Sequence, residues 1–390
     1  MAGTDYDIVI AGAGLAGISM AWRLAEPEFE HLRVLIVEPR TSYSRDRTWC
    51  FWKVHDQPFQ HLIRRAWMGW RVVSEDSVES ISDPSAPLYQ HLSSNALYEA
   101  FVERLESCRH IDLKLGVKVD AVFESGDGRH LRVVADEHEW TARLVLDSRP
   151  PVAGEAALVQ RFRGWEVETE EPVFDPKRLT LMDFRVEQQP EVGTHFVYVL
   201  PFNPRRALVE DTWIGSSSAA APDFDRHLAY YLEHRLGAKS WVRGWSEEGA
   251  LPMDPGLRPP VGRRRHLPIG IAAGALRAST GYGFLQVQRQ CDGLVEQLRR
   301  SCALERGLFV ESPTRSVTRW MDRVFLNYLR RYPERGPGLF SALFRRCPSP
   351  ALVRFLGGTG GALDHLRVVA SLPALPLLGE ALRWRPHHAT

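Results

Sequence analysis

Apolar residues form two short continuous runs near the start of the chain. Tyr6–Gly12 (YDIVIAG) and Arg33–Glu38 (RVLIVE) contain the unbroken apolar stretches that are typical of strands buried on both faces of a parallel sheet. The segment Gly14–Leu24 between them has the composition of a helix. Together the three segments predict one βαβ unit, which has a usual length of roughly 30 residues.

A period close to two replaces this pattern from about Val159 to Gly215. The clearest strands there are His195–Pro201 (HFVYVLP) and Arg206–Gly215 (RALVEDTWIG), and the Asn203-Pro204 turn between them predicts an antiparallel hairpin. The apolar stretch Leu267–Gly274 follows much later and leads into a turn and a helix. The remaining residues predict several short helices separated by Pro and Gly.

Composition and charge narrow the class of protein. The 390 residues are 44% hydrophobic and 25% charged, which is ordinary for a folded protein, and the net charge is +1. The charge is uneven, because residues 301–390 hold 13 Arg against 6 acidic residues. This basic C-terminal part favours an anionic partner surface. No apolar run approaches the roughly 18 residues that span a bilayer, so we expect any membrane contact to be peripheral.

The cysteines and histidines indicate neither a disulfide framework nor a metal site. The five cysteines are scattered without a C-x-x-C pair, and the histidines form no H-E-x-x-H motif. We therefore expect reduced thiols in a cytoplasmic protein that binds no metal.

A dinucleotide-binding motif lies in the predicted βαβ unit. Gly12-Ala13-Gly14-Leu15-Ala16-Gly17 has the form G-x-G-x-x-G, directly after a buried strand and at the start of a helix. The first glycine permits a tight turn, the second lets the backbone approach a pyrophosphate, and the third allows close packing of helix on strand. Glu38 ends the second strand, 21 residues beyond Gly17, and we expect it to accept hydrogen bonds from the adenosine ribose.

The motif alone does not separate FAD from NAD. Its position near the N-terminus favours FAD, because a second glycine-bearing segment lies far downstream at Ile269–Gly283. There the Gly281-Tyr282-Gly283 turn opens a helix that we expect to lie beside the flavin ring.

Six short motifs occur in order along the chain. They are IVIAGAGLAG near residues 8–17, RTWCF at 47–51, FVYVLPF at 196–202, LVEDT at 208–212, EEGALPM at 247–253 and STGYGF at 279–284. With them the chain resembles the bacterial lycopene beta-cyclase family over most of its length. The resemblance implies an α/β fold similar to that of FAD-dependent hydroxylases, with an FAD-binding Rossmann-type lobe, a β-rich substrate lobe and a helical C-terminal part. We expect the first lobe at 1–60, 93–155 and 256–300, the second at 61–92 and 156–255, and the helical basic part at 301–390.

The resemblance also implies a reaction. It is closure of the linear psi ends of lycopene into beta-ionone rings, which gives gamma-carotene and beta-carotene. FAD would act in its reduced form, with NAD(P)H as the reductant and no net redox change. The chain departs from the hydroxylases in Ile269–Gly274 (IGIAAG), where they carry an Asp that binds the ribityl chain. This departure favours a held, reduced flavin over turnover with oxygen.

Cyclisation needs a carboxyl group that stays protonated near neutral pH. The LVEDT strand offers Glu210 and Asp211, and strand alternation places their side chains on opposite faces. The family pattern favours Glu210 as the general acid, while we expect Asp211 to orient a neighbour or to support the strand. Without the resemblance, an exposed Glu-Asp pair at a strand end is the alternative.

Further candidates lie in or near the shared motifs. The aromatic side chains that could stabilise a carbocation together with the flavin are Trp49, Phe51, Tyr198 and Tyr282. Arg47 follows the second predicted strand, and it contacts the cofactor or forms a surface salt bridge. Asp147 comes directly after Leu144–Leu146, at the end of a predicted strand, and is a candidate neighbour of the cofactor.

The C-terminal part alternates aromatic residues with arginines in Trp320–Arg331 (WMDRVFLNYLRR), Leu339–Arg346 (LFSALFRR) and Leu352–Leu356 (LVRFL). These segments suit an interfacial amphipathic helix on an anionic bilayer, or a helical cap that packs on the core. No nucleic-acid recognition motif accompanies the charge, so we expect a membrane surface and not nucleic acid. Two other functions stay open: an FAD-dependent monooxygenase or oxidoreductase acting on another lipophilic or aromatic substrate, and a non-catalytic flavoprotein that assembles a carotenoid complex.

Overall fold

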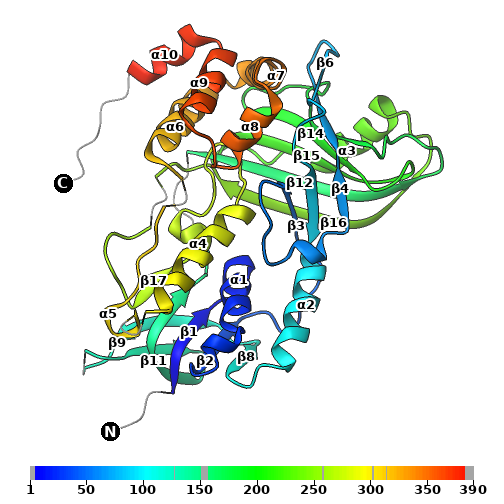
Figure 1. Cartoon of the computed structure of the whole chain (residues 1–390). Helices are drawn as coiled ribbons and strands as arrows, with labels where there is room; N and C mark the ends of the chain where they lie inside the picture. The colour runs from blue at the N-terminus through cyan, green and yellow to red at the C-terminus, as the bar shows by residue number, and fades with distance from the viewer. Residues whose placement is uncertain are drawn as a thin grey trace.

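The computed structural model describes residues 5–126, 128–150, 157–256, 259–300, 303–312 and 314–382. A mixed sheet lies at the N-terminal end of the molecule (Figure 1). Its strands are β1 (Tyr6–Ala11), β2 (Val34–Glu38), β8 (Ile111–Leu115), β9 (Val119–Glu124), β10 (Leu131–Ala135), β11 (His138–Asp147) and β17 (His266–Pro268). They lie in the order β8-β2-β1-β11-β10-β9, with β17 beside β11, and β1 is parallel to both of its neighbours.

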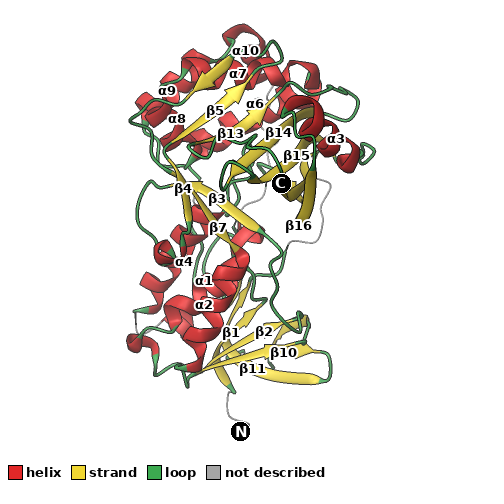
Figure 2. Cartoon of the chain, turned by 90° about the vertical axis from the view of Figure 1, so that its right-hand side faces the viewer, coloured by secondary structure: helices red, strands yellow, loops and turns green. Residues whose placement is uncertain are grey.

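Helices α1 (Leu15–Leu24), α2 (Ser94–Glu106) and α4 (Phe284–Leu298) cover one face of this sheet (Figures 1 and 2). Side chains of Ile8 and Ile10 from β1 form one hydrophobic core with Ile18 of α1 and Leu294 of α4. All of β2 is buried, which explains its unbroken apolar run. The predicted βαβ unit is therefore confirmed, and α4, far away in sequence, packs beside α1.

A second seven-stranded sheet lies at the other end of the molecule. Its strands are β5 (Gly69–Val73), β6 (Glu79–Ile81), β12 (Leu158–Thr169), β13 (Arg178–Asp183), β14 (Thr194–Pro201), β15 (Arg206–Ser216) and β16 (Trp241–Pro252). They lie in the order β16-β12-β15-β14-β13-β5-β6. The predicted antiparallel hairpin is confirmed as β14 and β15, in which Tyr198 lies opposite Glu210. The pattern had not indicated β16.

Both faces of this sheet are covered. Helix α3 (Phe224–Tyr230) packs on one face, where Val209 of β15 contributes to a core with Leu228. The C-terminal helices pack towards the other face, where Leu208 of β15 shares a core with Leu339. They are α6 (Ser316–Arg331), α7 (Gly336–Arg346), α8 (Ser349–Leu356), α9 (Ala362–Ser371) and α10 (Ala374–Leu382), after the short α5 (Ala303–Arg306). The C-terminal part is thus helical, as predicted.

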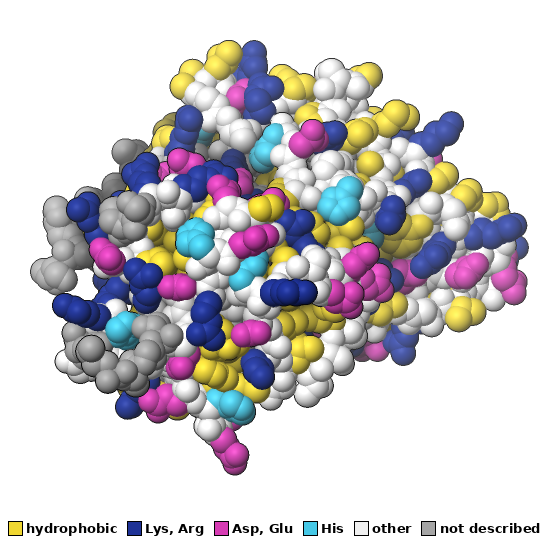
Figure 3. Space-filling view, turned by 60° about the horizontal axis from the view of Figure 1, so that its bottom comes forward, with side chains coloured by type: hydrophobic (Ala, Val, Ile, Leu, Met, Phe, Trp, Pro, Cys, Tyr) yellow, Lys and Arg dark blue, Asp and Glu magenta, His cyan; other side chains and the backbone are white. Residues whose placement is uncertain are grey.

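A small sheet of β3 (Thr48–Trp52), β7 (Tyr89–Ser93) and β4 (Arg65–Trp67) lies between the two larger sheets (Figure 2). A lobe boundary was predicted at residue 60, and this sheet pairs β3, which precedes it, with β4 and β7, which follow it. The boundary predicted at residue 155 lies outside the described residues. The division into lobes stays a prediction. On the face of the molecule shown in Figure 3, basic and acidic side chains are intermixed.

Candidate active site

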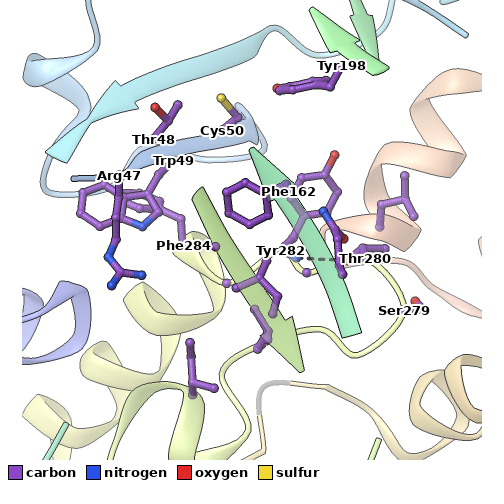
Figure 4. Close-up of a pocket in the computed structure, with 18 of the residues that line it drawn as sticks. Arg47, Thr48, Trp49, Cys50, Phe162, Tyr198, Ser279, Thr280, Tyr282 and Phe284 are labelled. Carbon is purple, nitrogen blue, oxygen red and sulfur yellow. Dashed lines mark hydrogen bonds between the residues drawn. The ribbon is translucent and has the colours of Figure 1, made fainter. Parts of the chain in front are cut away.

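One continuous cavity of about 560 Å³ runs between the N-terminal sheet and the C-terminal helices. At one end it is lined by Gly14, Leu15, Ala16, Arg40, Ser148, Arg149, Gly270 and Ile271. Its middle is lined by Arg47, Thr48, Trp49, Cys50, Tyr89, Phe162, Tyr198, Glu210, Glu247, Thr280 and Tyr282, several of which are drawn in Figure 4. Its far end is lined by Met321, Phe325, Phe340, Phe344, Val368 and Leu372. The cavity therefore connects the glycine motif to an apolar chamber.

The glycine turn has the geometry that the motif predicts. Gly12 has a φ of +92°, a conformation that side chains other than hydrogen rarely adopt. A Cβ atom added at Gly17 would lie 2.0 Å from the carbonyl oxygen of Gly12, so helix α1 can approach β1 only with a glycine there. A Cβ at Gly14 would meet no protein atom within 4 Å. The backbone at Gly14 is therefore open to a ligand in the cavity.

Glu38 lies at the end of β2, as predicted, but its carboxylate is already engaged. It accepts hydrogen bonds from the backbone N–H of Ala13 at 2.6 Å and from the Arg40 side chain at 2.8 Å. Burial alone would raise the pKa of Glu38, but the hydrogen bonds from Arg40 and Ala13 lower it overall. Arg40, which sequence reasoning missed, lines the cavity in its place. The contact of Glu38 with a ribose stays a prediction.

The candidate site residues of the RTWCF motif, at the start of β3 and along it, lie in two different places. Arg47 and Trp49 line the cavity, and the Arg47 side chain is 66% exposed, with Asp46 at 3.6 Å. Phe51 lies behind the cavity wall, where its ring stacks on Phe284 with centroids 4.3 Å apart. The structure thus brings Trp49 to the cavity and places Phe51 in the core beneath it.

Asp147 lies just outside the cavity. It ends β11 and forms an ion pair with Arg149 at 2.7 Å and a hydrogen bond with His266 at 3.1 Å. Burial opposes ionisation, but these two partners hold the pKa of Asp147 well below its usual range. The cavity is lined instead by Ser148 and Arg149, the residues that follow it.

Three tyrosine hydroxyls meet in the middle of the cavity. Tyr198 donates a hydrogen bond to Tyr89 at 3.2 Å, and the hydroxyls of Tyr89 and Tyr282 are 3.3 Å apart. Tyr282 comes from the Gly281-Tyr282-Gly283 turn, which opens α4 as predicted. Burial raises the pKa of each hydroxyl, so all three stay neutral near pH 7. Tyr89 was not predicted, because it lies in no recognisable motif.

Glu210 points into the cavity from β15. Burial raises its pKa to about 8, and the negative charge of Glu247 adds to the effect. Its side chain accepts a hydrogen bond from Thr212 at 3.1 Å. A carboxyl group with this pKa is mostly protonated at neutral pH, as a general acid must be. Glu247 lines the same cavity from β16 and is a site residue that sequence reasoning missed.

Asp211 faces the opposite side of the sheet, as strand alternation predicts. It is fully buried and hydrogen-bonds to His195, to the indole N–H of Trp213 at 3.1 Å and to His227 at 3.3 Å. Burial opposes its ionisation, but the histidines lower its pKa overall. His195, Asp211 and His227 also form a group that could ligate a metal ion, although Asp211 already forms a hydrogen bond with each histidine. Asp211 makes no contact with the cavity.

The C-terminal helices expose apolar side chains near the far end of the cavity. On α9, Leu363 is 59% exposed, Leu366 65% and Val369 48%, while Val368 of the same helix lines the cavity. Val317 and Trp320 of α6 are also exposed. Within the part of the chain that the structure describes, no helix combines the length and apolar character needed to cross a bilayer.

Comparison with known proteins places this geometry in a family. The chain is 29% identical to the lycopene beta-cyclase of a Paracoccus species, over 98% of this chain and 97% of that protein. Its fold is similar to a geranylgeranyl bacteriochlorophyll reductase-like protein of Thermoplasma acidophilum, with a TM-score of 0.65, 12% identity and coverage of 96% of this chain and 98% of that one. It is also similar to a probable FAD-dependent monooxygenase of Pseudomonas aeruginosa, with a TM-score of 0.57, 14% identity and coverage of 86% and 99%. The family described as lycopene cyclase protein matches residues 7–382. This chain therefore belongs to the lycopene cyclase family.

Proposed function

We propose that this chain is a lycopene beta-cyclase that closes the psi ends of lycopene into beta-ionone rings without net redox change. The observation that carries the proposal is Glu210 in its setting. Burial raises the pKa of this carboxyl group to about 8, and it faces a cavity lined in part by aromatic side chains in a member of the lycopene cyclase family. An acid that is both protonated and shielded from water is what protonation of an alkene requires.

We propose that FAD occupies the end of the cavity at the glycine turn. The open space at Gly14 and the N-terminus of α1 fit a pyrophosphate, which the backbone N–H groups of the first turn would bind. Residues 269–274 contain no acidic side chain, and Ile271 of this segment lines the same end of the cavity. Backbone groups would therefore hold the ribityl chain. Reduced with NAD(P)H and bound here, FAD supplies an electron-rich ring that stabilises positive charge.

Glu210 delivers the proton that starts ring closure. Its proton goes to the terminal double bond of the psi end, and the resulting cation is attacked by the next double bond along the chain. Tyr198 lies directly opposite Glu210 on β14, and Tyr282 and Trp49 line the same space. The faces of these rings attract a cation electrostatically. Unlike water, the rings do not readily form a bond to the cation, because they are weaker nucleophiles.

Lycopene reaches the cavity from a membrane in this proposal. The exposed apolar residues of α9 lie beside the far end of the cavity, and the C-terminal part is basic. We propose that this surface rests on the cytoplasmic face of an anionic bilayer. Leu366→Glu should reduce co-sedimentation with phosphatidylglycerol vesicles, whereas Val242→Glu, at an equally exposed site on β16, should not. Equal binding by both variants would exclude α9 as the contact.

The decisive experiment is expression in a host that accumulates lycopene, followed by pigment chromatography and mass spectrometry. We expect gamma-carotene and beta-carotene, which are isomers of lycopene, and no conversion with Glu210→Gln. An oxygenated product formed with stoichiometric NAD(P)H consumption would identify a monooxygenase instead. Unchanged lycopene in the presence of folded, flavin-loaded protein would refute the proposal.

A further inference from the structure

Glu210 has a carboxyl neighbour across the sheet. The strand order β16-β12-β15 places Glu247 and Glu210 on either side of Gly164, which pairs with Glu247 on one edge and with Glu210 on the other. Residues in one such row point to the same face of a sheet. Both side chains accordingly line the cavity.

Gly164 contributes no side chain between Glu210 and Glu247. A Cβ atom added there would lie 3.4 Å from Cγ of Glu247, 3.6 Å from Cβ of Glu210 and 3.1 Å from a methyl group of Leu208. The side chains of Glu210 and Glu247 thus lean over a residue that has none. The Leu208 methyl group also reaches this space, so the row contains one apolar contact beside the two glutamates.

The Glu247 carboxyl group is buried without a full set of partners. The residue is 8% exposed, and none of the described residues hydrogen-bonds to its Oε1 atom. A buried carboxylate oxygen without a donor is costly unless a ligand or a proton supplies the missing interaction. Thr48, Cys50 and Tyr198 surround this part of the cavity (Figure 4).

The charges around the pair come from several elements. Burial raises the pKa of Glu247 to about 7, although Thr48 and the positive charges of Arg45 and Arg47 act in the other direction. On β15 itself, Asp211 adds a small upward effect on the pKa of Glu210 from the opposite face. Cys50 on β3 and Tyr198 on β14 stay neutral, because burial raises the pKa of both groups.

We propose that Glu210 and Glu247 form a carboxyl pair that holds one proton, in which Glu210 gives the proton that starts cyclisation and Glu247 takes the proton that ends it. This inference rests on the proposed cyclase function and names the base that the function leaves open. Two close carboxyl groups in a shielded site cannot both ionise readily, so the singly protonated pair is the favoured state.

The proton balance closes within the pair. The O–H bond of Glu210 breaks, and a C–H bond forms at the hydrogen-bearing carbon of the terminal double bond, which leaves the positive charge on the carbon with two methyl groups. A carbon–carbon bond then closes the ring, and the positive charge moves to the ring carbon that bears a methyl group. The neighbouring C–H bond breaks, its electrons form the ring double bond, and Glu247 receives the proton. Transfer of that proton from Glu247 to Glu210 restores the starting state.

The position of Glu247 also bears on the type of ring. The final cation can lose a proton from more than one adjacent carbon, and the base that lies nearest determines which double bond forms. Because Glu247 is held in one position beside Gly164, it favours removal of the proton from one of these carbons. Removing it should therefore change both the rate and the product.

The test compares Glu247→Gln with the wild type, using purified flavin-loaded protein and lycopene in phosphatidylcholine vesicles. We expect Glu247→Gln to lower turnover at its best pH by about 100-fold or more, with bound flavin unchanged and the residual product shifted away from the beta ring. Glu247→Asp should restore part of the rate. Glu168→Gln is the matched control, because Glu168 is an exposed carboxylate on β12 that does not line the cavity.

Wild-type turnover and an all-beta product from Glu247→Gln would overturn the inference, while loss of activity in Glu210→Gln would leave the cyclase proposal intact. If the wild type forms no ring at all, the cyclase proposal itself fails. Should Glu247→Gln not fold, the wild-type pH–rate profile decides. A bell-shaped dependence of the rate on pH, which rises near the pKa of Glu247 and falls near that of Glu210, supports the pair. A rate that falls only at high pH refutes it.

Discussion

Replacing Glu210 by Gln removes an ionisable carboxyl group from a buried environment that disfavours its negative charge. Its pKa is raised from 4.5 to about 8 by burial and by the charge of Glu247. A carboxyl group with a raised pKa binds more protons in the folded chain than in the unfolded chain. The free energy of unfolding therefore decreases as the pH rises from 4.5 towards about 8.

The size of the effect follows from the shift. Ionising Glu210 in the unfolded chain while it stays protonated in the folded one costs folding about 3 kcal/mol at neutral pH. Water that enters the cavity screens part of this cost, which leaves about 1 to 3 kcal/mol. Glu210→Gln should thus be more stable than the wild type at neutral pH, although it is inactive as a cyclase.

Urea unfolding of flavin-free protein from about pH 5 to about pH 8 measures this difference. We expect the stability gain of Glu210→Gln to be smallest near pH 5 and to grow with pH. Glu168→Gln, at an exposed position on β12, provides the control and should show no such trend. A gain that is independent of pH, or a variant that is less stable at neutral pH, would refute the assignment of Glu210 as a buried protonated acid.

Three further substitutions test the framework around the site. Gly14→Ala should fold normally but retain less FAD after gel filtration, whereas Gly17→Ala should unfold at lower temperature, because its methyl group would lie 2.0 Å from the carbonyl oxygen of Gly12. Gly164→Ala should fold and keep most of its turnover, because the added methyl group would lie at ordinary contact distances of 3.4 Å from Glu247 and 3.6 Å from Glu210, and only the Leu208 methyl group, at 3.1 Å, would have to shift. Asp211→Asn should lower the free energy of unfolding in urea by about 1 to 3 kcal/mol, because an amide cannot accept all the buried hydrogen bonds that the carboxylate makes with His195, Trp213 and His227.

The parts of the fold that sequence predicts best are those encoded by consecutive residues. In the glycine turn at 12–17, Gly12 allows the tight bend, Gly14 leaves the backbone open to a ligand at the start of the helix, and Gly17 allows the helix to approach the strand closely. The β14–β15 hairpin is equally local, because one short turn sets its register. Alternation along β15 then determines that Glu210 and Asp211 face opposite sides.

The parts that sequence did not predict depend on contacts between distant segments. Glu247 lies in a motif that was recognised, but its pairing with Glu210 exists only because β12 runs between β15 and β16. Tyr89 meets Tyr282 from a strand that lies 193 residues away in sequence. Phe51 shares a motif with Trp49, yet it packs on Phe284 behind the wall, and no local pattern separates the two roles.

The adjacent residues Glu210 and Asp211 show how one strand supports two opposite charge states. Asp211 receives hydrogen bonds from His195 and Trp213, which favour its ionised form on the face that packs against α3. Glu210 faces the cavity and Glu247, and burial with a like charge favours its protonated form. The proposed function needs each residue where it is: an ionised Glu210 could not protonate an alkene, and a neutral Asp211 would lose hydrogen-bonding capacity towards His195 and Trp213. A register slip of one residue in β15 would exchange the two environments. The dense pairing of β15 with both β12 and β14 therefore protects the chemistry as well as the fold.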